Sequence, residues 1–467
     1  MPRLAPDLQF AVGEGTHPDQ SVRAPSQHMA GAAIAGAAGV LGGRVVDGEL
    51  GAVILVDRQY AASDRHGRVS IGDITATLMS GRDALTVLTG GSPACGRAAA
   101  AEPRSRRDPA PGSRGTSAPD SPLPTSHSRQ EPDLWFLDLE TTGLAGGAGT
   151  QAFLVGCAQL DADGMSVRQF LLPGYEHERA LLAEVAAWAS ARGAIVTFNG
   201  KSFDVPLIET RFLFHRVPFP FDGTPHVDVL HPARRLWRAR GSVDGVEEAS
   251  CSLGTLERLL GGVHRVGDVP GFEIPSRYFQ FVRDGDARPL AAVLEHNRLD
   301  LVSLALVLAR ALTLIERGPG STRDAYECLG LARLYDRAGL ADDADAAYER
   351  AIERLERIGR DPESCGDALR RLAWCRRRAG RVGEAAEAWR RLADLPRCPS
   401  ALRCQAREAL AIHHEHRVRD LETARAHAER LLTEQAGGRW REAAEHRLRR
   451  IERKLERKRA PDLWTEP

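Results

Sequence analysis

The chain has 467 residues, which is too long for one ordinary hydrophobic core and predicts two or three domains. Lysine plus arginine and aspartate plus glutamate number 63 each, so net charge gives no general attraction to phosphate, and any nucleic-acid surface must come from local clustering. The 8 cysteines are scattered without a C-x-x-C pair, which excludes the pattern of a disulfide-stapled secreted domain and favours a reducing cytoplasm.

The amino-terminal region divides into three stretches. Residues 1–44 and 93–130 are rich in small and polar residues without periodicity, and both are predicted to be disordered, the second as a linker. The Ala/Gly run that ends the first stretch is expected to be a flexible segment without a function of its own. Small residues bury too little apolar surface to offset the conformational entropy that ordering costs. Residues 45–92 hold a strand-like run at 52–60 and a helical stretch at 81–91, and are predicted to be a small ordered appendage of the next domain. Since the chain start lacks a signal pattern, we expect a cytoplasmic protein outside the membrane.

From Leu134 to about Leu314, strand-like apolar runs alternate with helical patterns. The strand-like runs are LWFLDLE, AFLVGCAQL, VRQFLLP and AIVTFN, and the helical ones are ERALLAEVAAWASARG and DVPLIETRFLFHR. Strands followed by β–α alternation predict an α/β domain over residues 131–317, with a mixed sheet flanked by helices.

Residues 322–459 read as helical and contain an internal repeat. Four positions recur 41 residues later, as the pairs Ala332 and Ala373, Gly339 and Gly380, Ala344 and Ala385, and Tyr348 and Trp389. A third, weaker copy places Ala424 where Ala385 lies. Small residues at helix contacts, a glycine turn and an aromatic near the second helix match the tetratricopeptide pattern, although the spacing exceeds the usual one of roughly 34 residues.

The last helical segment, GRWREAAEHRLRRIERKLERKR, is basic and amphipathic. It is expected to cap the repeat array, and the alternative is that it binds nucleic acid. Because repeat arrays present concave surfaces, a protein partner is expected for residues 322–455.

Acidic residues stand at the edges of three predicted elements. In FLDLETTGL, Asp138 and Glu140 lie two apart on a strand, so the pleat projects both carboxylates from one face. In TFNGKSFDVPLI, Asp204 opens a helix after a glycine turn, and in EHNRLDLVSL, His296 and Asp300 share one helical face. Each motif alone has an ordinary explanation as a turn cap, a helix cap or a solvated helix face. Their joint order and spacing favour a single site.

The motif set D-x-E-T-T-G-L, N-G-x-x-F-D and H-x-x-x-D resembles the three exonuclease motifs of the DnaQ-like, four-acid (DEDD) superfamily. More closely, Leu134 to about Leu314 resembles the YprB-like, RNase H-like branch, including the intervening VDVLHPARRLW, SLGTLERLLG and VPGFEIPSRYF. Members of that branch similarly carry tetratricopeptide repeats after the nuclease domain. The resemblance implies an RNase H-like fold and removal of nucleotides from a free 3′ end.

Four carboxylates suit Mg²⁺ or Mn²⁺, which retain waters and bind phosphate oxygens. Two such ions about 3.5–4 Å apart can activate a water and stabilise the leaving oxygen of a phosphodiester. By the resemblance, Asp138 would bridge both ions, Glu140 and Asp300 would bind the ion that carries the attacking water, and Asp204 would act through water.

His296 is the expected general base, because a neutral imidazole near pH 7 can accept a proton from that water. Its spacing departs from the superfamily pattern. A catalytic His usually lies five residues before the last Asp and a catalytic Tyr four before, whereas His296 lies four before Asp300. Glu295, at the five-residue position, is expected to be a solvated helix residue.

The resemblance also implies substrate contacts. The backbone around Thr142 and the side chain of Leu144 would hold the terminal nucleotide, with Asn199 beside it, although Leu144 fits equally well as a buried turn residue. Downstream, HPARRLWRAR gathers arginines around Trp237, which suits either nucleic-acid contact or an amphipathic helix with Trp237 in the core. Asp228 is expected to cap that helix rather than serve as a fifth ligand.

The sequence therefore predicts a metal-dependent 3′–5′ exonuclease, with DNA in repair or processing as the first choice of substrate. RNA trimming is the enzyme alternative, because nothing in the sequence shows what reads the sugar. An adaptor that binds a partner through its repeats, with a silent nuclease fold, is the alternative from another class. The presence of all four acids argues against it.

Overall fold

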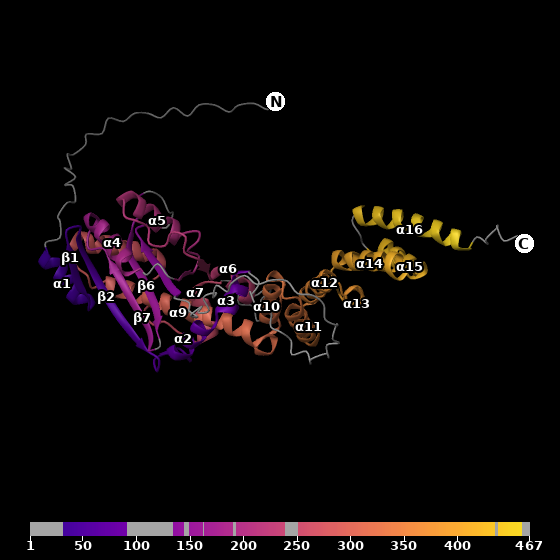
Figure 1. Ribbon diagram of the computed structural model, residues 1–467, viewed down its shortest axis with the longest axis horizontal. Coiled ribbons are helices and arrows are strands. Elements are labelled where there is room, and N and C mark those ends of the chain that lie inside the picture. The colour runs from indigo at the N-terminus through magenta and orange to yellow at the C-terminus, as the bar shows by residue number, and fades with distance from the viewer. Residues whose placement is uncertain are drawn as a thin grey trace, which may run out of the picture.

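The computed structural model describes residues 31–90, 134–143, 149–161, 163–189, 193–238, 251–434 and 438–459. Two regions follow one another along the longest axis: a sheet covered by helices, then an elongated array of helices that reaches the carboxyl-terminal end (Figure 1). Residues 1–30 and the whole of the predicted linker 93–130 lie outside this part of the chain. No helix in the described ranges is both long enough and apolar enough to cross a bilayer.

The described residues form one seven-stranded mixed sheet in the order β1-β2-β7-β6-β5-β8-β9. Its strands are β1 (Arg44–Gly48), β2 (Gly51–Ala61), β5 (Leu134–Thr141), β6 (Ala152–Asp161), β7 (Gly164–Leu171), β8 (Ala194–Thr197) and β9 (His226–Asp228). Strands β5, β8 and β9 run parallel to one another, and the remaining pairs are antiparallel. A separate two-stranded ribbon joins β3 (Arg65–His66) to β4 (Val69–Ser70). The predicted α/β fold with a mixed sheet and flanking helices is confirmed.

Helices cover both faces of the sheet. They are α1 (Gly31–Leu41), α2 (Ile71–Ser80), α3 (Arg82–Thr89), α4 (Glu178–Trp188), α5 (Asp204–His215), α6 (Leu230–Trp237), α7 (Leu253–Gly261), α8 (Ile274–Asp284) and α9 (Leu290–Arg317), with short turns η1 (Tyr175–His177), η2 (Gly271–Glu273) and η3 (Pro319–Ser321). Alternation along β5 divides its side chains: Leu134 and Phe136 pack with α2, α7 and most of α9, whereas Trp135 and Leu137 pack with α1, α4, α5 and α8. The sheet therefore separates two apolar cores.

The expectation that residues 1–44 are disordered is wrong for their last part. The Ala/Gly run forms α1, which buries Ile34 and Leu41 against the core that contains β2. Gly43, in the turn that follows the helix, lies close to β2: a Cβ on Gly43 would lie 2.5 Å from the Leu55 carbonyl oxygen. Packing on the sheet thus orders a segment whose own composition predicts flexibility.

Residues 45–92 are built into the sheet rather than appended to it. Strand β2 pairs with β7 over eight residues, from Ile54 opposite Leu171 to Ala61 opposite Gly164. Helices α2 and α3 then pack in the core that contains α9. The described sheet region therefore begins well before the predicted boundary at residue 131.

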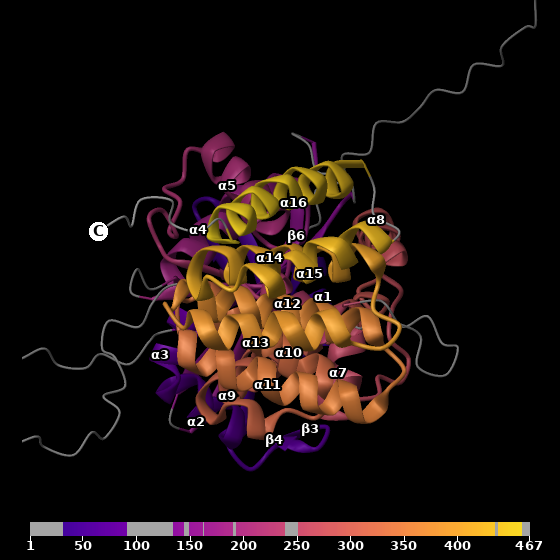
Figure 2. The ribbon, with the colours of Figure 1, turned by 90° about the vertical axis from the view of Figure 1, so that its right-hand side faces the viewer.

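The second region is a stack of helices that lie side by side in successive layers (Figure 2). It comprises α10 (Ala325–Arg337), α11 (Ala341–Ile358), α12 (Pro362–Arg378), α13 (Val382–Asp394), α14 (Ser400–His413), a π-helical turn η4 (His414–Val418), α15 (Leu421–Thr433) and α16 (Gly438–Arg459). The repeated small and aromatic positions are all buried, namely Ala332, Ala344, Tyr348, Ala373, Ala385 and Trp389. Gly339 and Gly380 adopt the same positive φ, 77° and 78°.

The 41-residue repeat in the sequence therefore corresponds to a repeated helical hairpin.

Candidate active site

Asp138 and Glu140 stand near the carboxyl end of β5. Both are partly buried, whereas Leu137 and Leu139 between them are buried in the opposite core. The pairing of β5 with β6 shifts its register between Glu140 and Thr141, so the regular ladder ends where the second acid stands. Because β5 and β8 are parallel, the turn that follows β8 reaches the same edge of the sheet.

Asp138 is fixed by Asn297, a fully buried residue of α9. The Asn297 amide donates to the Asp138 carboxylate at 2.8 Å and to the Asp138 backbone oxygen at 3.2 Å. Gln169 on β7 donates to the Asn297 carbonyl oxygen at 2.8 Å. Opposite Asp138 in the ladder stands Gly156, where a Cβ would lie 2.1 Å from Asn297. A glycine on β6 thus makes room for the side chain that orients the first acid.

Asp204 is the first residue of α5 and is buried. The turn before it contains Asn199 at φ 71° and is held by Asp228, which accepts from the amides of Asn199 at 2.8 Å and Lys201 at 3.1 Å. Asp228 also accepts from the amide of Leu230 at the start of α6. The cap position of α6 is Val229 rather than the predicted Asp228, and Asp228 instead braces the turn that presents Asp204.

His296 and Asp300 lie one turn apart on α9, as predicted. His296 Nδ1 is 2.7 Å from an Asp268 carboxylate oxygen, and its Nε2 is 3.6 Å from Asp300. The Arg265 guanidinium forms an ion pair with the other oxygen of Asp300 at 2.5 Å and reaches Asp268 at 3.4 Å. Asp268 and Arg265, both from the segment after α7, complete a four-residue cluster.

Arg265 also forms an ion pair with a buried carboxylate, that of Glu257. Glu257 on α7 accepts two hydrogen bonds from the guanidinium, each 2.8 Å long. It also accepts from the Ser303 hydroxyl, which in turn lies 2.8 Å from His66 of β3. Because the Arg265 guanidinium bonds to both Glu257 and Asp300, its position is set by α7, α9 and the N-terminal ribbon together.

Burial raises the pKa values of all four acids, and repulsion from the others adds to the shift for Asp138 and Glu140. Burial raises the pKa of Asp138 well above its ordinary value, and the charges of the other three acids raise it further. Burial, followed by the charges of Asp300 and Asp204, also raises the pKa of Glu140. Burial raises the pKa of Asp204 to about 7. Burial raises the pKa of Asp300 as well, although Arg265 and His296 oppose the shift. All four acids can ionise together only where positive charge is supplied.

The donor set fits divalent metal ions in its chemistry, because clustered, partly buried carboxylates are the ligands that Mg²⁺ and Mn²⁺ prefer. The side chains are not already arranged around an ion: among the described residues, no three His, Cys, Asp or Glu side chains surround a common metal position. One of these carboxylates, Asp300, is instead paired with Arg265. Metal ions would therefore have to draw the carboxylates together.

The residues expected to contact substrate lie in different surroundings. Thr142 lines a cavity of about 460 Å³, and its hydroxyl accepts from the Gln151 amide at 3.0 Å. The Asn199 side chain is exposed at the turn after β8, while Leu144 lies outside the described residues. Trp237 is in the core, where its ring nitrogen donates to Glu327 of α10 at 2.7 Å. The core alternative for Trp237 is therefore confirmed.

Three residues of this site are not singled out by the sequence motifs: Arg265, Asp268 and Asn297. Arg265 and Asp268 lie in an irregular segment without periodicity, so no pattern marks them. Asn297 could have been found from two signals, its position beside His296 and the glycine inside the β6 run AFLVGCAQL.

Comparison with known proteins identifies the sheet region. Residues 135–312 match the model of the RNase_H superfamily. The chain is also similar to the uncharacterized protein YprB of Bacillus subtilis (strain 168), with 33% identity over 309 residues, which are 65% of this chain and 70% of that protein. The superfamily match indicates a nuclease, and therefore a protein that binds nucleic acid. RNase H-like nucleases typically use divalent metal ions.

Proposed function

The chain belongs to the family of the uncharacterized protein YprB, and we propose that it is a metal-dependent 3′–5′ exonuclease of the four-acid type. The observation that carries the proposal is the charge imbalance at the edge of the sheet. Asp138, Glu140, Asp204 and Asp300 come from β5, α5 and α9, yet the ion pair with Arg265 balances only part of their charge. A folded protein keeps such a cluster at a cost in stability, and cation binding supplies the missing compensation.

In this proposal the four carboxylates hold two ions, Mg²⁺ or Mn²⁺. When bound, such ions supply charge for an attacking water and for the leaving oxygen of a phosphodiester. Asn297 keeps the Asp138 carboxylate oriented, and Arg265 occupies one oxygen of Asp300 so that the other remains for a ligand. Second contacts of this kind orient ligand side chains and tune their affinity.

His296 accepts the proton of the attacking water in this proposal. Asp268 accepts a hydrogen bond from Nδ1–H, which leaves the lone pair on Nε2, the nitrogen that faces Asp300. This pairing also lowers the pKa of Asp268, despite the opposing effect of its burial, so Asp268 stays ionised and stabilises the imidazolium that forms. Asp268 thus acts as a positioning residue for the base.

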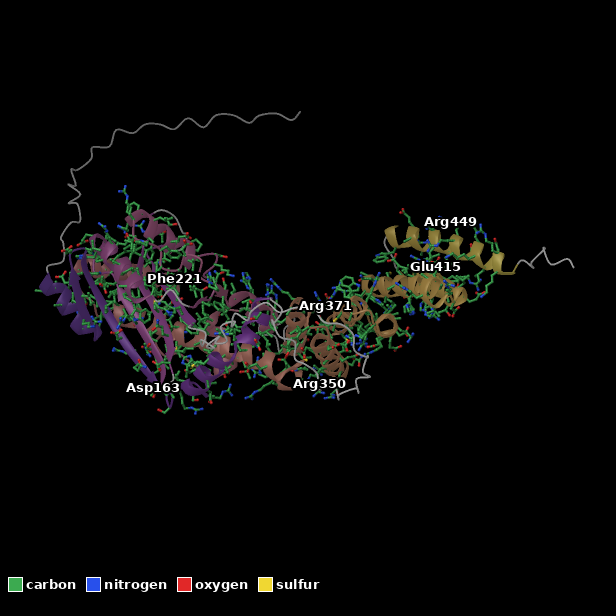
Figure 3. The ribbon with its side chains drawn as sticks, in the orientation of Figure 1. Asp163, Phe221, Arg350, Arg371, Glu415 and Arg449 are labelled. Carbon is green, nitrogen blue, oxygen red and sulfur yellow. The ribbon has the colours of Figure 1, made fainter. Side chains whose placement is uncertain are left out.

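The 3′–5′ direction, and DNA as the preferred substrate, rest on the resemblance of the three motifs. The direct test uses 3′-labelled and 5′-labelled strands of DNA and RNA with Mg²⁺ or Mn²⁺. We expect stepwise shortening from the 3′ end that Asp138→Ala abolishes. Asp163→Ala, an exposed acid in the β6–β7 turn (Figure 3), should cleave like the unmodified protein.

Two results would change the proposal. Faster shortening of RNA than of DNA makes the protein an exoribonuclease. If neither nucleic acid is cleaved with either ion, the nuclease proposal fails and an adaptor role replaces it.

We assign the helical array to tetratricopeptide-like repeats that bind a protein partner. A cavity of about 440 Å³ between α12, α13 and α14 supports this assignment, because it is lined by Trp374, Trp389 and Ile412 in a region remote from the acids. A photo-crosslinker at Trp374 in cells should capture one protein, and one at exposed Ile358 on α11 should not. Equal labelling from both positions would remove the partner from the proposal.

A further inference from the structure

A cavity of about 320 Å³ lies between α1, β2, β7 and the first turns of α9. Its volume is at the lower end of the range of small-molecule sites, which is roughly 300–1,000 Å³. Apolar side chains and a few polar groups together form its walls, as is typical of such sites. Its lining includes Gly39 of α1, Val56 and Arg58 of β2, Gln169 of β7, and Glu295 and Arg298 of α9.

This cavity and the candidate active site use opposite faces of α9. His296 and Asp300 are about half a helical turn away from the residues of α9 that line the cavity, since each residue adds about 100°. The lining residues share one face because they are spaced three and four apart: Ala291, Leu294, Glu295 and Arg298. A ligand in the cavity therefore contacts neither His296 nor Asp300.

Positive charge exceeds negative charge in the cavity. Glu295 is the one carboxylate among the lining residues, and it accepts a hydrogen bond from Arg298 at 3.0 Å. Arg58 donates to the backbone oxygen of Asp57, and no carboxylate in the described ranges forms an ion pair with it. Burial, followed by the charge of Arg58, lowers the pKa of Arg298, so the two guanidinium groups are close enough to repel each other. A bound anion would relieve this repulsion.

Arg298 is already held in place. Its side chain is only 19% exposed, and Glu295 fixes it from the same helix. Its guanidinium also lies 5.4 Å from the centre of the Tyr60 ring. An arginine that is held in this way loses little entropy when it binds an anion.

Gln169 offers a hydrogen-bond acceptor at the buried side of the cavity. Its nitrogen donates to the backbone oxygen of Leu294 and to the side-chain oxygen of Asn297, each at 2.8 Å. No residue in the described part of the chain donates to the carbonyl oxygen of Gln169, so this oxygen can accept from a ligand. The cavity thus suits a ligand that has an anionic group, a hydrogen-bond donor and an apolar part.

From these contacts we propose that the cavity binds a small phosphomonoester, with its phosphate at Arg58 and Arg298 and a hydroxyl or amino group donating to Gln169. Arginine binds phosphate through pairs of parallel hydrogen bonds. A phosphomonoester carries a charge of about −1.5 to −2 at pH 7, which matches two guanidinium groups better than a carboxylate does.

The site is independent of the proposed nuclease function. Two of its four walls, α1 and β2, come before residues 135–312, so the superfamily match does not include them.

Isothermal titration calorimetry of the metal-free full chain tests the proposal. Without metal the four acids repel phosphate, so binding at the candidate active site does not contribute. The probes are thymidine monophosphate, ribose phosphate and inorganic phosphate. We expect one phosphomonoester to bind per chain. Arg58→Gln should weaken its binding by roughly 10- to 100-fold, since a hydrogen bond to a charged group contributes about 1.5–3 kcal/mol. Arg58→Lys, which keeps the charge, should recover part of this loss.

A change in α1 tests the cavity while both arginines stay in place. A Cβ at Gly39 meets no atom within 4 Å, so Gly39→Leu should fill part of the cavity and abolish binding. Gly36→Leu is the matched control, because Gly36 stands in the same helix, has the same open space and does not line the cavity. Neither variant should lower the melting temperature, since leucine favours a helix more than glycine does.

Three results would overturn the proposal. The first is that the unmodified protein binds neither phosphomonoester. The second is that Arg58→Gln and Gly39→Leu bind them as tightly as the unmodified protein does. The third is that inorganic phosphate binds as tightly as the phosphomonoesters, which would make the ligand the free phosphate ion and leave Gln169 without a role.

Discussion

Two clusters of charged side chains in this protein are built in opposite ways. At the edge of the sheet, four acids lie near one another, and one of them, Asp300, pairs with Arg265 and lies 3.6 Å from His296. At the far end of the helical array, Glu415 stands alone among cations (Figure 3). Its side chain is fully buried and bonds to Arg447 at 2.9 Å, Arg450 at 2.5 Å and Lys454 at 2.7 Å.

The pKa values show what the difference means. Burial opposes the shift, but hydrogen bonds from the three cations lower the pKa of Glu415 to about 2. This cluster is already compensated, and its role is to attach α16 to η4. The pKa of Asp204 moves the other way, to about 7, because burial and the charge of Asp228 both favour its neutral form. An uncompensated cluster is arranged for an added ligand, whereas a compensated one is arranged for stability.

The largest expected effect is the loss of activity without loss of stability at the uncompensated cluster. Glu140→Gln should lower the cleavage rate about 1,000-fold, because a metal ligand supplies several kcal/mol to the transition state. Without metal, its melting temperature should not fall, since the change removes a charge that repels Asp300. Cleavage rates and thermal unfolding in EDTA measure the two effects.

Glu295→Gln is the control for this variant, because Glu295 is an exposed acid on α9 that pairs with Arg298. Its activity should match that of the unmodified protein. A Glu140→Gln protein that keeps its activity, or that unfolds at a clearly lower temperature in EDTA, would show that this cluster is structural after all.

The next effect concerns the proton acceptor. His296→Ala should lower kcat about 100-fold, the usual contribution of a general base, while the metal concentration for half-maximal activity changes much less. Asp268→Asn should reproduce a smaller part of the loss, about tenfold, because it only positions the ring. Steady-state rates across a Mn²⁺ titration separate these effects. An unchanged rate for His296→Ala removes this residue from the mechanism.

Much of the fold could be predicted because its signals are local. Strand-like apolar runs at 52–60 and 134–140 predicted β2 and β5, and the glycines that follow the helical stretch at 81–91 predicted the end of α3 at Gly90. Helix α1 was missed for the opposite reason. Its composition is that of a flexible segment, and only contacts with a distant strand order it. Tertiary packing overrides local propensity in such segments.

The candidate site shows the same difference between local sequence signals and contacts with distant segments. The acids on β5, α5 and α9 could be predicted from three motifs whose spacing depends on local secondary structure. Their supports could not, because Arg265 and Asp268 reach α9 from an irregular segment about thirty residues away. The ion pair between Glu257 and Arg265, and its link through Ser303 to His66, likewise depend on contacts between distant elements. Sequence patterns predict the acids, and the fold determines what holds them.

A third prediction addresses the compensated cluster. Glu415→Ala leaves three cations facing one another and should reduce the free energy of unfolding of the array by about 3 kcal/mol, as expected when one partner of a buried ion pair is removed. Detachment of α16 should appear as faster proteolytic cleavage between α15 and α16. Nuclease activity should stay unchanged, because Glu415 lies in the helical array, far along the molecule from the sheet (Figure 1 and Figure 3).

The control for Glu415→Ala is Glu387→Ala on α13, where both partners of the Glu387–Arg390 pair are about half exposed. A pair of this kind contributes well under about 1 kcal/mol. If both variants unfold at the same temperature, the buried cluster has no special role in holding α16.

The smallest expected effect is a pH dependence of opposite sign in the two clusters. Burial raises the pKa of the Asp204 carboxyl to about 7, so this carboxyl binds its proton more tightly in the folded state, and the metal-free protein should lose stability as pH rises from about 4 to about 7. This shift alone corresponds to roughly 2–3 kcal/mol between pH 5 and pH 8, and Mn²⁺ or Asp204→Asn should reduce the slope. Glu415, with a folded pKa of about 2, contributes stability that is complete above its unfolded pKa of about 4.5 and is lost only in stronger acid. Melting temperatures in EDTA across this range make the comparison. A metal-free protein that becomes steadily more stable from pH 5 to pH 8, with or without Asp204, would show that the four acids do not repel one another in solution.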